Sequence, residues 1–190
     1  MNRNIFFLFF RQSERTPNLI RLNPTFPKNF SVMRMVVEIG SVAPDISLVD
    51  MDFKQRSLKD FRGKKLVLAF FPGAFTSVCK KEMCTIRDDL AKLEKLGAQV
   101  IAVSVNDPFT LKDFHDDNAL NFPLLSDFAR ETVKTYDIEL HDFARLKGYT
   151  VAKRSAFVID KDGVVRWKWI SDNPGVEPDY AEIRRQLEKI

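Results

Sequence analysis

The chain is poor in the residues that build disulfide frameworks, metal sites and membrane spans. It has two cysteines and two histidines in 190 residues. Two cysteines are too few for a disulfide scaffold, and a domain of this length does not need one, so they favour an intracellular redox or catalytic role. No apolar run approaches the roughly 18–20 residues that cross a bilayer. We therefore predict a cytoplasmic protein with no membrane partner and, because paired ligand spacings are absent, no zinc site.

Acidic side chains are scarce at the N-terminus. Residues 1–34 hold six basic side chains and one acid, a formal charge of +5, whereas residues 35–190 hold 24 basic and 25 acidic side chains, a charge of −1. The body of the chain therefore lacks the basic surface that nucleic acid requires. The apolar run at residues 5–10 is shorter than the roughly 7–15 residues of a signal peptide core. We interpret residues 1–34 as an extension that is disordered, a targeting segment, or not native, with translation starting at Met33 or Met35.

Strand and helix patterns alternate after this extension, with no internal repeat or linker. We expect one domain over residues 35–190. The expected strand-like segments are 36–49, 66–71, 99–105, 122–125, 155–160 and 164–170, and the expected helices are 76–96, 108–118, 127–136 and 178–190. Parallel strands joined by helices, followed by a hairpin and a last helix, predict an α/β fold with a central mixed sheet flanked by helices. This is the connectivity of a thioredoxin-like fold.

The most informative segment is residues 72–79, Pro-Gly-Ala-Phe-Thr-Ser-Val-Cys, between the apolar strand 66–71 and the amphipathic helix 76–96. Cys79 at a strand-to-helix junction lies among free backbone N–H groups, at the positive end of a helix dipole. Both stabilise a thiolate over a thiol, and the thiolate is the reactive nucleophile. The sequence therefore places one of its two cysteines where sulfur becomes reactive.

The pattern Pro72-x-x-x-Thr76-x-x-Cys79 resembles the signature of the peroxiredoxins, thiol peroxidases on the thioredoxin fold. Two single residues agree with it. Glu82 falls where many family members carry glutamate, and Arg154 falls on the family's arginine at the start of a late strand. The run Phe-Pro-Leu-Leu-Ser-Asp at residues 122–127 also resembles a family segment, so the resemblance covers about residues 36–190.

This resemblance implies a peroxidase in which Cys79 attacks a peroxide and becomes a sulfenic acid. Arg154 would supply positive charge and forked donors to the sulfur and the peroxide, and Glu82 would orient Arg154. Thr76 would donate its hydroxyl proton to the sulfur or the peroxide. Pro72, which has no N–H and a fixed φ, would shape the loop and shield the thiolate. Hydrogen peroxide and organic hydroperoxides would be the substrates, and no cofactor is needed.

Cys84 follows Cys79 by five residues, which resembles the bacterioferritin-comigratory-protein or peroxiredoxin Q subgroup, whose resolving cysteine lies in the same helix. In a helix, positions i and i+5 have Cα atoms roughly 8.6 Å apart. A disulfide needs about 4.4–6.8 Å. We therefore expect the first turn and a half of the helix to unwind before a Cys79–Cys84 disulfide forms. The alternative is that Cys84 is a core residue and an external thiol resolves Cys79.

The expected partners are a peroxide and a thioredoxin- or glutaredoxin-like reductant, with the protein a monomer or a homodimer. A thioredoxin-type disulfide oxidoreductase is less well supported, because its cysteines would be spaced Cys-x-x-Cys. The non-enzymatic alternative is a thioredoxin-fold interaction or holdase protein that uses the aromatic N-terminal extension as its contact surface. His115 and His141 have polar, charged neighbours, and the motif marks neither as a catalytic base.

Overall fold

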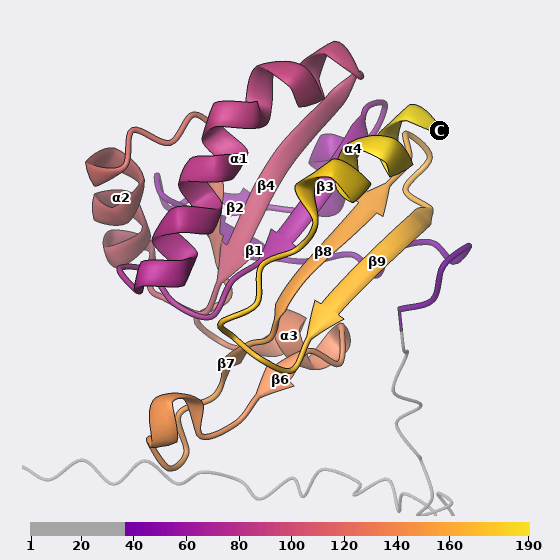
Figure 1. Ribbon diagram of the computed structural model, residues 1–190. Coiled ribbons are helices and arrows are strands. Elements are labelled where there is room, and N and C mark those ends of the chain that lie inside the picture. The colour runs from indigo at the N-terminus through magenta and orange to yellow at the C-terminus, as the bar shows by residue number, and fades with distance from the viewer. Residues whose placement is uncertain (1–36) are drawn as a thin grey trace, which may run out of the picture. The chain divides into compact units, whose positions relative to one another are not determined.

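The computed structural model describes residues 37–190, so the interpretation of residues 1–34 lies outside the described residues. Figure 1 shows the arrangement of the elements. The strands are β1 (Leu48–Asp50), β2 (Gln55–Arg56), β3 (Lys65–Phe70), β4 (Ala98–Ser104), β5 (Leu124–Ser126), β6 (Glu139–Leu140), β7 (Val151–Ala152), β8 (Arg154–Ile159) and β9 (Val165–Ser171). The helices are η1 (Leu58–Phe61), α1 (Ser77–Lys95), α2 (Pro108–Asp117), α3 (Glu131–Thr135), η2 (Phe143–Arg145) and α4 (Tyr180–Glu188), where η marks a 3-10 helix.

Seven strands form one mixed sheet in the order β2-β1-β5-β4-β3-β8-β9. β3, β4 and β5 run parallel, and the remaining neighbours in the sheet run antiparallel. A parallel pair needs a crossover connection, which α1 supplies between β3 and β4 and α2 supplies between β4 and β5. The predicted α/β architecture with a central mixed sheet and flanking helices is confirmed.

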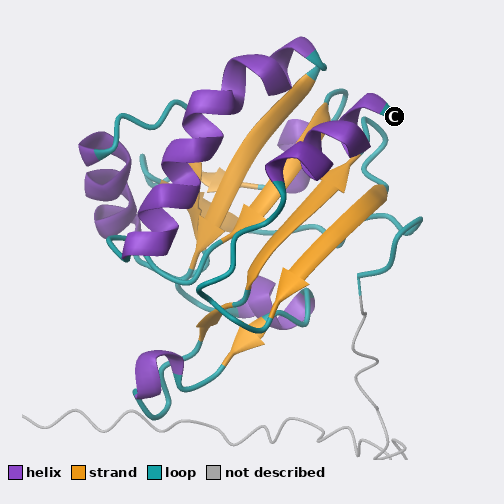
Figure 2. Cartoon of the chain, in the orientation of Figure 1, coloured by secondary structure: helices purple, strands orange, loops and turns teal. Residues whose placement is uncertain are grey.

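The sheet separates two hydrophobic cores because side chains alternate along each strand. On β3, Leu66 and Leu68 belong to the core shared with α3 and η1, whereas Val67 and Ala69 belong to the core shared with α1, α2 and α4. Figure 2 shows α1 and α4 together in front of the sheet. Both faces of β3 are therefore covered, as its continuous apolar sequence predicts.

Helix α1 begins directly after a sharp change of chain direction. Phe75 has a left-handed φ of +64°. Thr76 is the extended N-cap residue, with φ −79° and ψ +148°. The helix ends before Gly97, whose φ is +75° and whose N–H donates to the Glu94 carbonyl at 2.9 Å. Apolar side chains spaced three and four residues apart are buried, as the amphipathic pattern predicts: Met83, Ile86, Leu90 and Leu93.

The expected helix over residues 127–136 is wrong at its start, because α3 begins only at Glu131. Asp127 is buried, and its carboxylate accepts hydrogen bonds from the backbone N–H groups of Thr132, at 3.1 Å, and Val133, at 2.9 Å. An aspartate that bonds these N–H groups stands outside the helix, since a capping side chain must reach back from a non-helical position. Arg130, with φ +61°, turns the chain between the two.

The predicted strand region over residues 36–49 is also shorter than expected. Only β1 at its end is a strand, and Val42 adds a single bridge to Val164. The sequence prediction omitted β2. The connection between α3 and β8, residues 138–153, is an arm in which β6 and β7 pair and enclose η2 (Figure 1).

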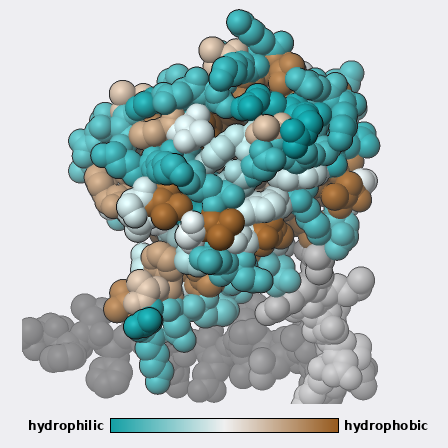
Figure 3. All heavy atoms as spheres, in the orientation of Figure 1, coloured by the Kyte–Doolittle hydropathy of each residue, from teal (hydrophilic) through white to brown (hydrophobic). Residues whose placement is uncertain are grey.

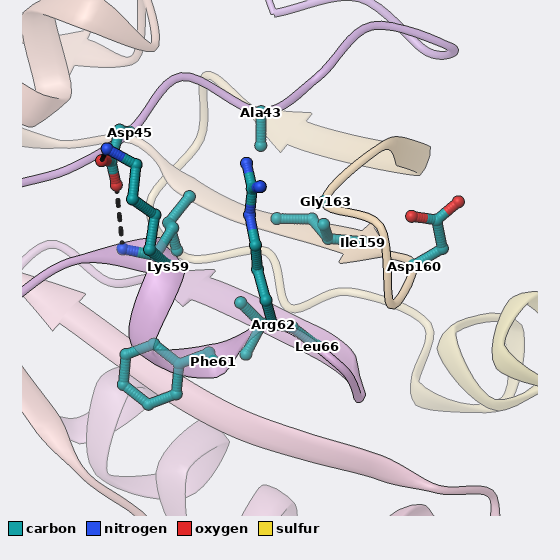
Figure 4. A pocket seen from close by; sticks show the side chains of 10 residues that line it. Ala43, Asp45, Lys59, Phe61, Arg62, Leu66, Ile159, Asp160 and Gly163 are labelled. Atoms are coloured by element: carbon teal, nitrogen blue, oxygen red, sulfur yellow. Dashed lines mark hydrogen bonds and ion pairs between the residues drawn. The ribbon is translucent and has the colours of Figure 1, made fainter.

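A small cavity of about 30 Å³ lies between η1, the segment around Ala43 and the β8–β9 turn (Figure 4). Asp45 closes one side, accepting from the Lys59 ammonium at 2.9 Å and from the Ser57 hydroxyl at 2.8 Å. This volume has room for only one or two water molecules. None of its lining residues lines the pocket at Cys79, so we assign it a packing role.

None of the helices within residues 37–190 is both long and apolar enough to cross a membrane. Over the same residues, every buried side-chain nitrogen and oxygen has a hydrogen-bond partner. Buried polar groups in this fold are thus paired, including the charged ones at the site described below.

Candidate active site

Cys79 lies in the first turn of α1 and is only 1% exposed. Its sulfur accepts a hydrogen bond from a terminal nitrogen of Arg154, with an Nη2–Sγ distance of 3.3 Å. The free N–H groups of the first helical turn add positive potential at the same place. A fixed cation and a helix N-terminus therefore both act on this sulfur, and both favour its anionic form.

Arg154 reaches Cys79 because of strand order rather than sequence proximity. Strand β8 begins at Arg154 and runs antiparallel to β3, with Ser155 paired to Phe70. The start of β8 therefore lies beside the end of β3, where the loop to Cys79 begins. The Arg154 side chain is 1% exposed, so its charge acts in a nearly dry environment.

The guanidinium of Arg154 is held by two further partners. The Pro174 carbonyl accepts from Nε at 3.2 Å and from Nη2 at 2.7 Å. On its other side Nη1 forms an ion pair with the carboxylate of Glu82. Because the guanidinium is planar and its donors are fixed, these contacts set the direction of the donor that reaches the sulfur.

Glu82 is as buried as Arg154, with 1% of its side chain exposed. Burial raises the pKa of the Glu82 carboxyl to about 7, although the charge of Arg154 acts in the opposite direction and that of Glu177 adds to the rise. The rise reflects the cost of placing a carboxylate where little water reaches it, and the ion pair with Arg154 is what stabilises its charge there.

Thr76 and Pro72 both line the pocket in front of Cys79. The Thr76 hydroxyl donates to the Gly73 carbonyl at 3.0 Å. From the sequence we expected this hydroxyl to donate to the sulfur or the peroxide. In the structure its proton is directed to Gly73 instead, which leaves its oxygen as an acceptor. Pro72 is buried at the start of the loop.

The pocket itself has a volume of about 180 Å³. Four chain segments form it: the β3–α1 loop with the first turn of α1, the arm, the start of β8 and the β9–α4 loop. The residues are Pro72, Thr76, Ser77, Val78, Cys79, Phe143, Arg154, Pro174 and Gly175. The structure therefore brings Pro72, Thr76, Cys79 and Arg154 to one cavity, with Glu82 behind Arg154.

Asn106 is a site residue that the sequence analysis missed. Its side-chain oxygen accepts from the Ala74 backbone N–H at 2.9 Å and from the Ser104 hydroxyl at 2.9 Å. Ser126 donates to the Asn106 backbone carbonyl at 2.6 Å. This cluster ties the ends of β4 and β5 to the loop before Cys79. The only sequence signal is a polar residue just after a buried strand, where loops of parallel strands meet.

The β9–α4 loop supplies a second group of missed contacts. Besides the Pro174 carbonyl, it carries Glu177, which pairs with Lys81 of α1 at 2.5 Å and accepts from the Tyr180 hydroxyl at 2.7 Å. Burial raises the pKa of Tyr180, and the nearby charge of Glu82 adds to the rise. The loop thus holds both the arginine and the first turns of α1.

Cys84 lies on the same continuous helix but has different surroundings. It is partly exposed, and its sulfur lies 3.9 Å from the side-chain oxygen of Asn118 at the end of α2. Five residues along a helix correspond to a rotation of about 140°, so the two sulfurs leave α1 on different sides. Both thiols are free, and the Cys79–Cys84 juxtaposition that a disulfide needs is not formed in this state.

Neither histidine belongs to the pocket. His115 contacts Asp116 at 3.0 Å, and His141 contacts the Thr150 hydroxyl at 3.0 Å. Over the described part of the chain there is no group of three or more histidine, cysteine, aspartate or glutamate side chains placed to bind a metal ion.

Comparisons with known proteins show which family the chain resembles. A model of the AhpC/TSA family matches residues 39–168. The chain is 34% identical over 151 residues to chloroplastic peroxiredoxin Q of Gentiana triflora, an alignment covering 80% of this chain and 67% of that protein. It is 33% identical over 129 residues to peroxiredoxin Bcp of Escherichia coli K12, covering 68% of this chain and 83% of that protein.

Among solved structures, the chain is similar to a peroxiredoxin-like protein from Aquifex aeolicus, with a TM-score of 0.70 and 26% identity. The superposition covers 81% of this chain and 88% of that one. This likeness confirms the predicted thioredoxin-like fold.

Proposed function

The chain belongs to the AhpC/TSA family, in which its curated relatives are peroxiredoxins, and on that premise we propose that it reduces hydrogen peroxide and organic hydroperoxides with Cys79 as the nucleophile. The observation that carries the proposal is the 3.3 Å contact between the buried Arg154 guanidinium and the Cys79 sulfur. An arginine that donates to a buried sulfur at a helix N-terminus serves the thiolate, since a neutral thiol gains much less from a cation.

The reaction balances with these groups. The Cys79 thiolate attacks the terminal oxygen of a hydroperoxide, the S–O bond forms, and the O–O bond breaks. The products are the Cys79 sulfenic acid and an alkoxide, or hydroxide from hydrogen peroxide, which takes up a proton to leave as an alcohol or water. Arg154 donates to the sulfur and to the oxygen on which negative charge develops.

We assign the neighbouring residues supporting roles. Glu82 and the Pro174 carbonyl position the guanidinium of Arg154. Pro72 covers one side of the sulfur, and the Thr76 oxygen, whose proton is engaged by Gly73, is free to accept a hydrogen bond from the peroxide O–H. These roles use each group in the protonation state that its present partners favour.

We further propose that Cys84 resolves the sulfenic acid, forming a Cys79–Cys84 disulfide and releasing water. The two residues lie on one unbroken helix, so the segment between them must unwind first. Glu82 belongs to that segment, and its ion pair with buried Arg154 has to break as it unwinds. Unwinding thus removes the Glu82–Arg154 ion pair from the site. Only the reduced, helical form keeps the arrangement that we propose attacks peroxide.

A dithiol protein of the thioredoxin or glutaredoxin type would then reduce the disulfide and restore the helix. We propose a monomer or a homodimer acting in the cytoplasm. Residues 35–190 would form the catalytic domain and residues 1–34 an extension outside it.

The test is steady-state peroxide consumption by the wild type and the Cys79→Ser and Cys84→Ser variants, each supplied with thioredoxin or with dithiothreitol. We expect Cys79→Ser to abolish turnover with either reductant. Cys84→Ser should lose turnover with thioredoxin and keep it with dithiothreitol, because a small thiol can reach the sulfenic acid directly. Mass spectrometry of the oxidised wild type should find one intramolecular disulfide.

Other outcomes select the alternatives. Unchanged turnover in Cys79→Ser would remove the peroxidase proposal and leave a thioredoxin-fold oxidoreductase or holdase. Full thioredoxin-dependent turnover of Cys84→Ser, with no intramolecular disulfide in the wild type, would show instead that an external thiol resolves Cys79.

A further inference from the structure

The pocket at Cys79 is larger than hydrogen peroxide requires. Roughly 10–15 Å³ of such space holds one water molecule, and hydrogen peroxide has only two heavy atoms, whereas the pocket has a volume of about 180 Å³. Part of the remaining space is bordered by apolar side chains, those of Pro72, Val78, Phe143 and Pro174. Hydrogen peroxide has polar groups at both ends, so contact with these apolar side chains does not favour its binding.

Phe143 differs from the other lining residues because it comes from the arm, outside the main sheet. Its ring packs on that of Tyr149, with centroids 6.0 Å apart, and both side chains rest against the core cluster on the α3 side of the sheet. Figure 3 shows hydrophobic side chains gathered between the helices and the arm. Phe143 thus joins a structural cluster to the mouth of the site.

The backbone of the arm is built to hold this ring. The Phe143 N–H donates to the Tyr149 carbonyl at 2.9 Å, and the Gly148 N–H donates to the Asp142 carboxylate at 2.7 Å. Asp142 and Ala144, on either side of Phe143, have left-handed φ values of +52° and +55°. Such conformations are unfavourable for residues other than glycine, so the neighbouring contacts must maintain them.

We propose that Phe143 is a specificity-determining residue that contacts the organic substituent of a hydroperoxide while its O–O group lies between Cys79 and Arg154. The proposal rests on the peroxidase activity proposed above. An aromatic wall favours an alkyl or aryl hydroperoxide through apolar contact, and it offers hydrogen peroxide nothing comparable.

The test compares kcat/KM for cumene hydroperoxide with kcat/KM for hydrogen peroxide in the wild type and in Phe143→Ala. We expect the ratio of the two constants to fall about fivefold to tenfold, the range associated with one aromatic contact. The matched control is Leu146→Ala, since Leu146 lies on the same arm, is 58% exposed and does not line the pocket. This control should leave the ratio within twofold of the wild type.

An equal loss for both peroxides, or no change in the ratio, would overturn the role of Phe143. A wild type that consumes neither peroxide would instead remove the proposed function itself. Should Phe143→Ala fail to fold, as thermal unfolding would reveal, Phe143→Leu keeps an apolar side chain and removes only the ring. The kcat/KM ratio of the two peroxides should then fall about twofold to threefold in Phe143→Leu. An unaltered ratio would equally refute the proposal.

Discussion

The two cysteines of α1 lie five residues apart and differ in nearly every physical respect. Each has an arginine and an asparagine nearby. At Cys79 the arginine is buried and bonds the sulfur, and Asn106 holds the preceding loop. At Cys84 the arginine is Arg87, which is partly exposed and donates to the Asn118 backbone carbonyl at 2.6 Å. The Cys84 thiol itself donates to the Asn118 side-chain oxygen over 3.9 Å.

The difference teaches that one helix can place two thiols in very different electrostatic surroundings. The first turn supplies a positive potential that fades within a turn, so Cys84 lies beyond its reach. Burial removes water around Cys79 and strengthens its contact with the arginine, whereas the surroundings of Cys84 are more open. We therefore expect only the Cys79 sulfur, and not that of Cys84, to attack a peroxide.

The largest expected effect in this comparison is the loss of peroxide reactivity when Arg154 is replaced by lysine, compared with the same replacement of Arg87. Arg154→Lys keeps the charge but loses the fork that serves the sulfur, Glu82 and Pro174 together, so the second-order rate with hydrogen peroxide should fall about 10²-fold. Arg87→Lys is the matched control and should stay within twofold of the wild type; equal losses in both variants would erase the contrast between the two cysteines.

A smaller loss of the peroxide rate is expected when Asn106 is replaced by alanine, compared with the same replacement of Asn118. Asn106→Ala leaves the Ala74 N–H and the Ser104 hydroxyl without their acceptor. Losing this link should misplace the loop before Cys79 and lower the peroxide rate about tenfold. Asn118→Ala should spare that rate, because its contacts lie at Cys84 and at the end of α2. Stopped-flow kinetics with hydrogen peroxide would measure both, and a greater loss in Asn118→Ala would contradict the assignment.

The last expected effect leaves the two cysteines' rates aside and is a pH dependence of stability. Because burial raises the pKa of Glu82 from 4.5 to about 7 in the folded protein, the folded state binds a proton that the unfolded state releases between these values. Stability contributed by the protonated carboxyl is therefore present at low pH and lost as pH rises through this window, by roughly 1.4 kcal/mol per pH unit at most.

Urea unfolding between pH 4.5 and 7 would measure this slope. Glu82→Gln should remove it, since the amide does not titrate. Asp88→Asn is the control on the same helix, because Asp88 is 67% exposed and its pair with Arg87 contributes little. A slope that persists in Glu82→Gln would assign the proton to another group.

The sequence predicted most elements of this fold and placed Cys79 at its strand-to-helix junction. These predictions succeed where local physics decides, as in the buried β3 run and the apolar spacing of α1. They fail at Asp127, where a side chain bonds N–H groups five and six residues ahead and replaces the expected first turn of α3. They also missed Asn106, because nothing in its neighbourhood of sequence reveals that the loop before Cys79 passes beside it.

By itself, the sequence determined which sulfur opens a helix, because a continuous apolar strand, a turn and an amphipathic pattern are local properties. It also limited Cys84 to a position that a folded helix cannot bring to Cys79. Only the tertiary structure decided that a positively charged guanidinium lies beside the Cys79 sulfur. Arg154 is 75 residues away in the chain, and only the antiparallel pairing of β8 with β3 and the β9–α4 loop deliver its guanidinium to Cys79 and bury it there. The burial of the guanidinium and the direction of its donors depend on contacts between distant parts of the chain, so the spacing of residues along the sequence cannot predict them.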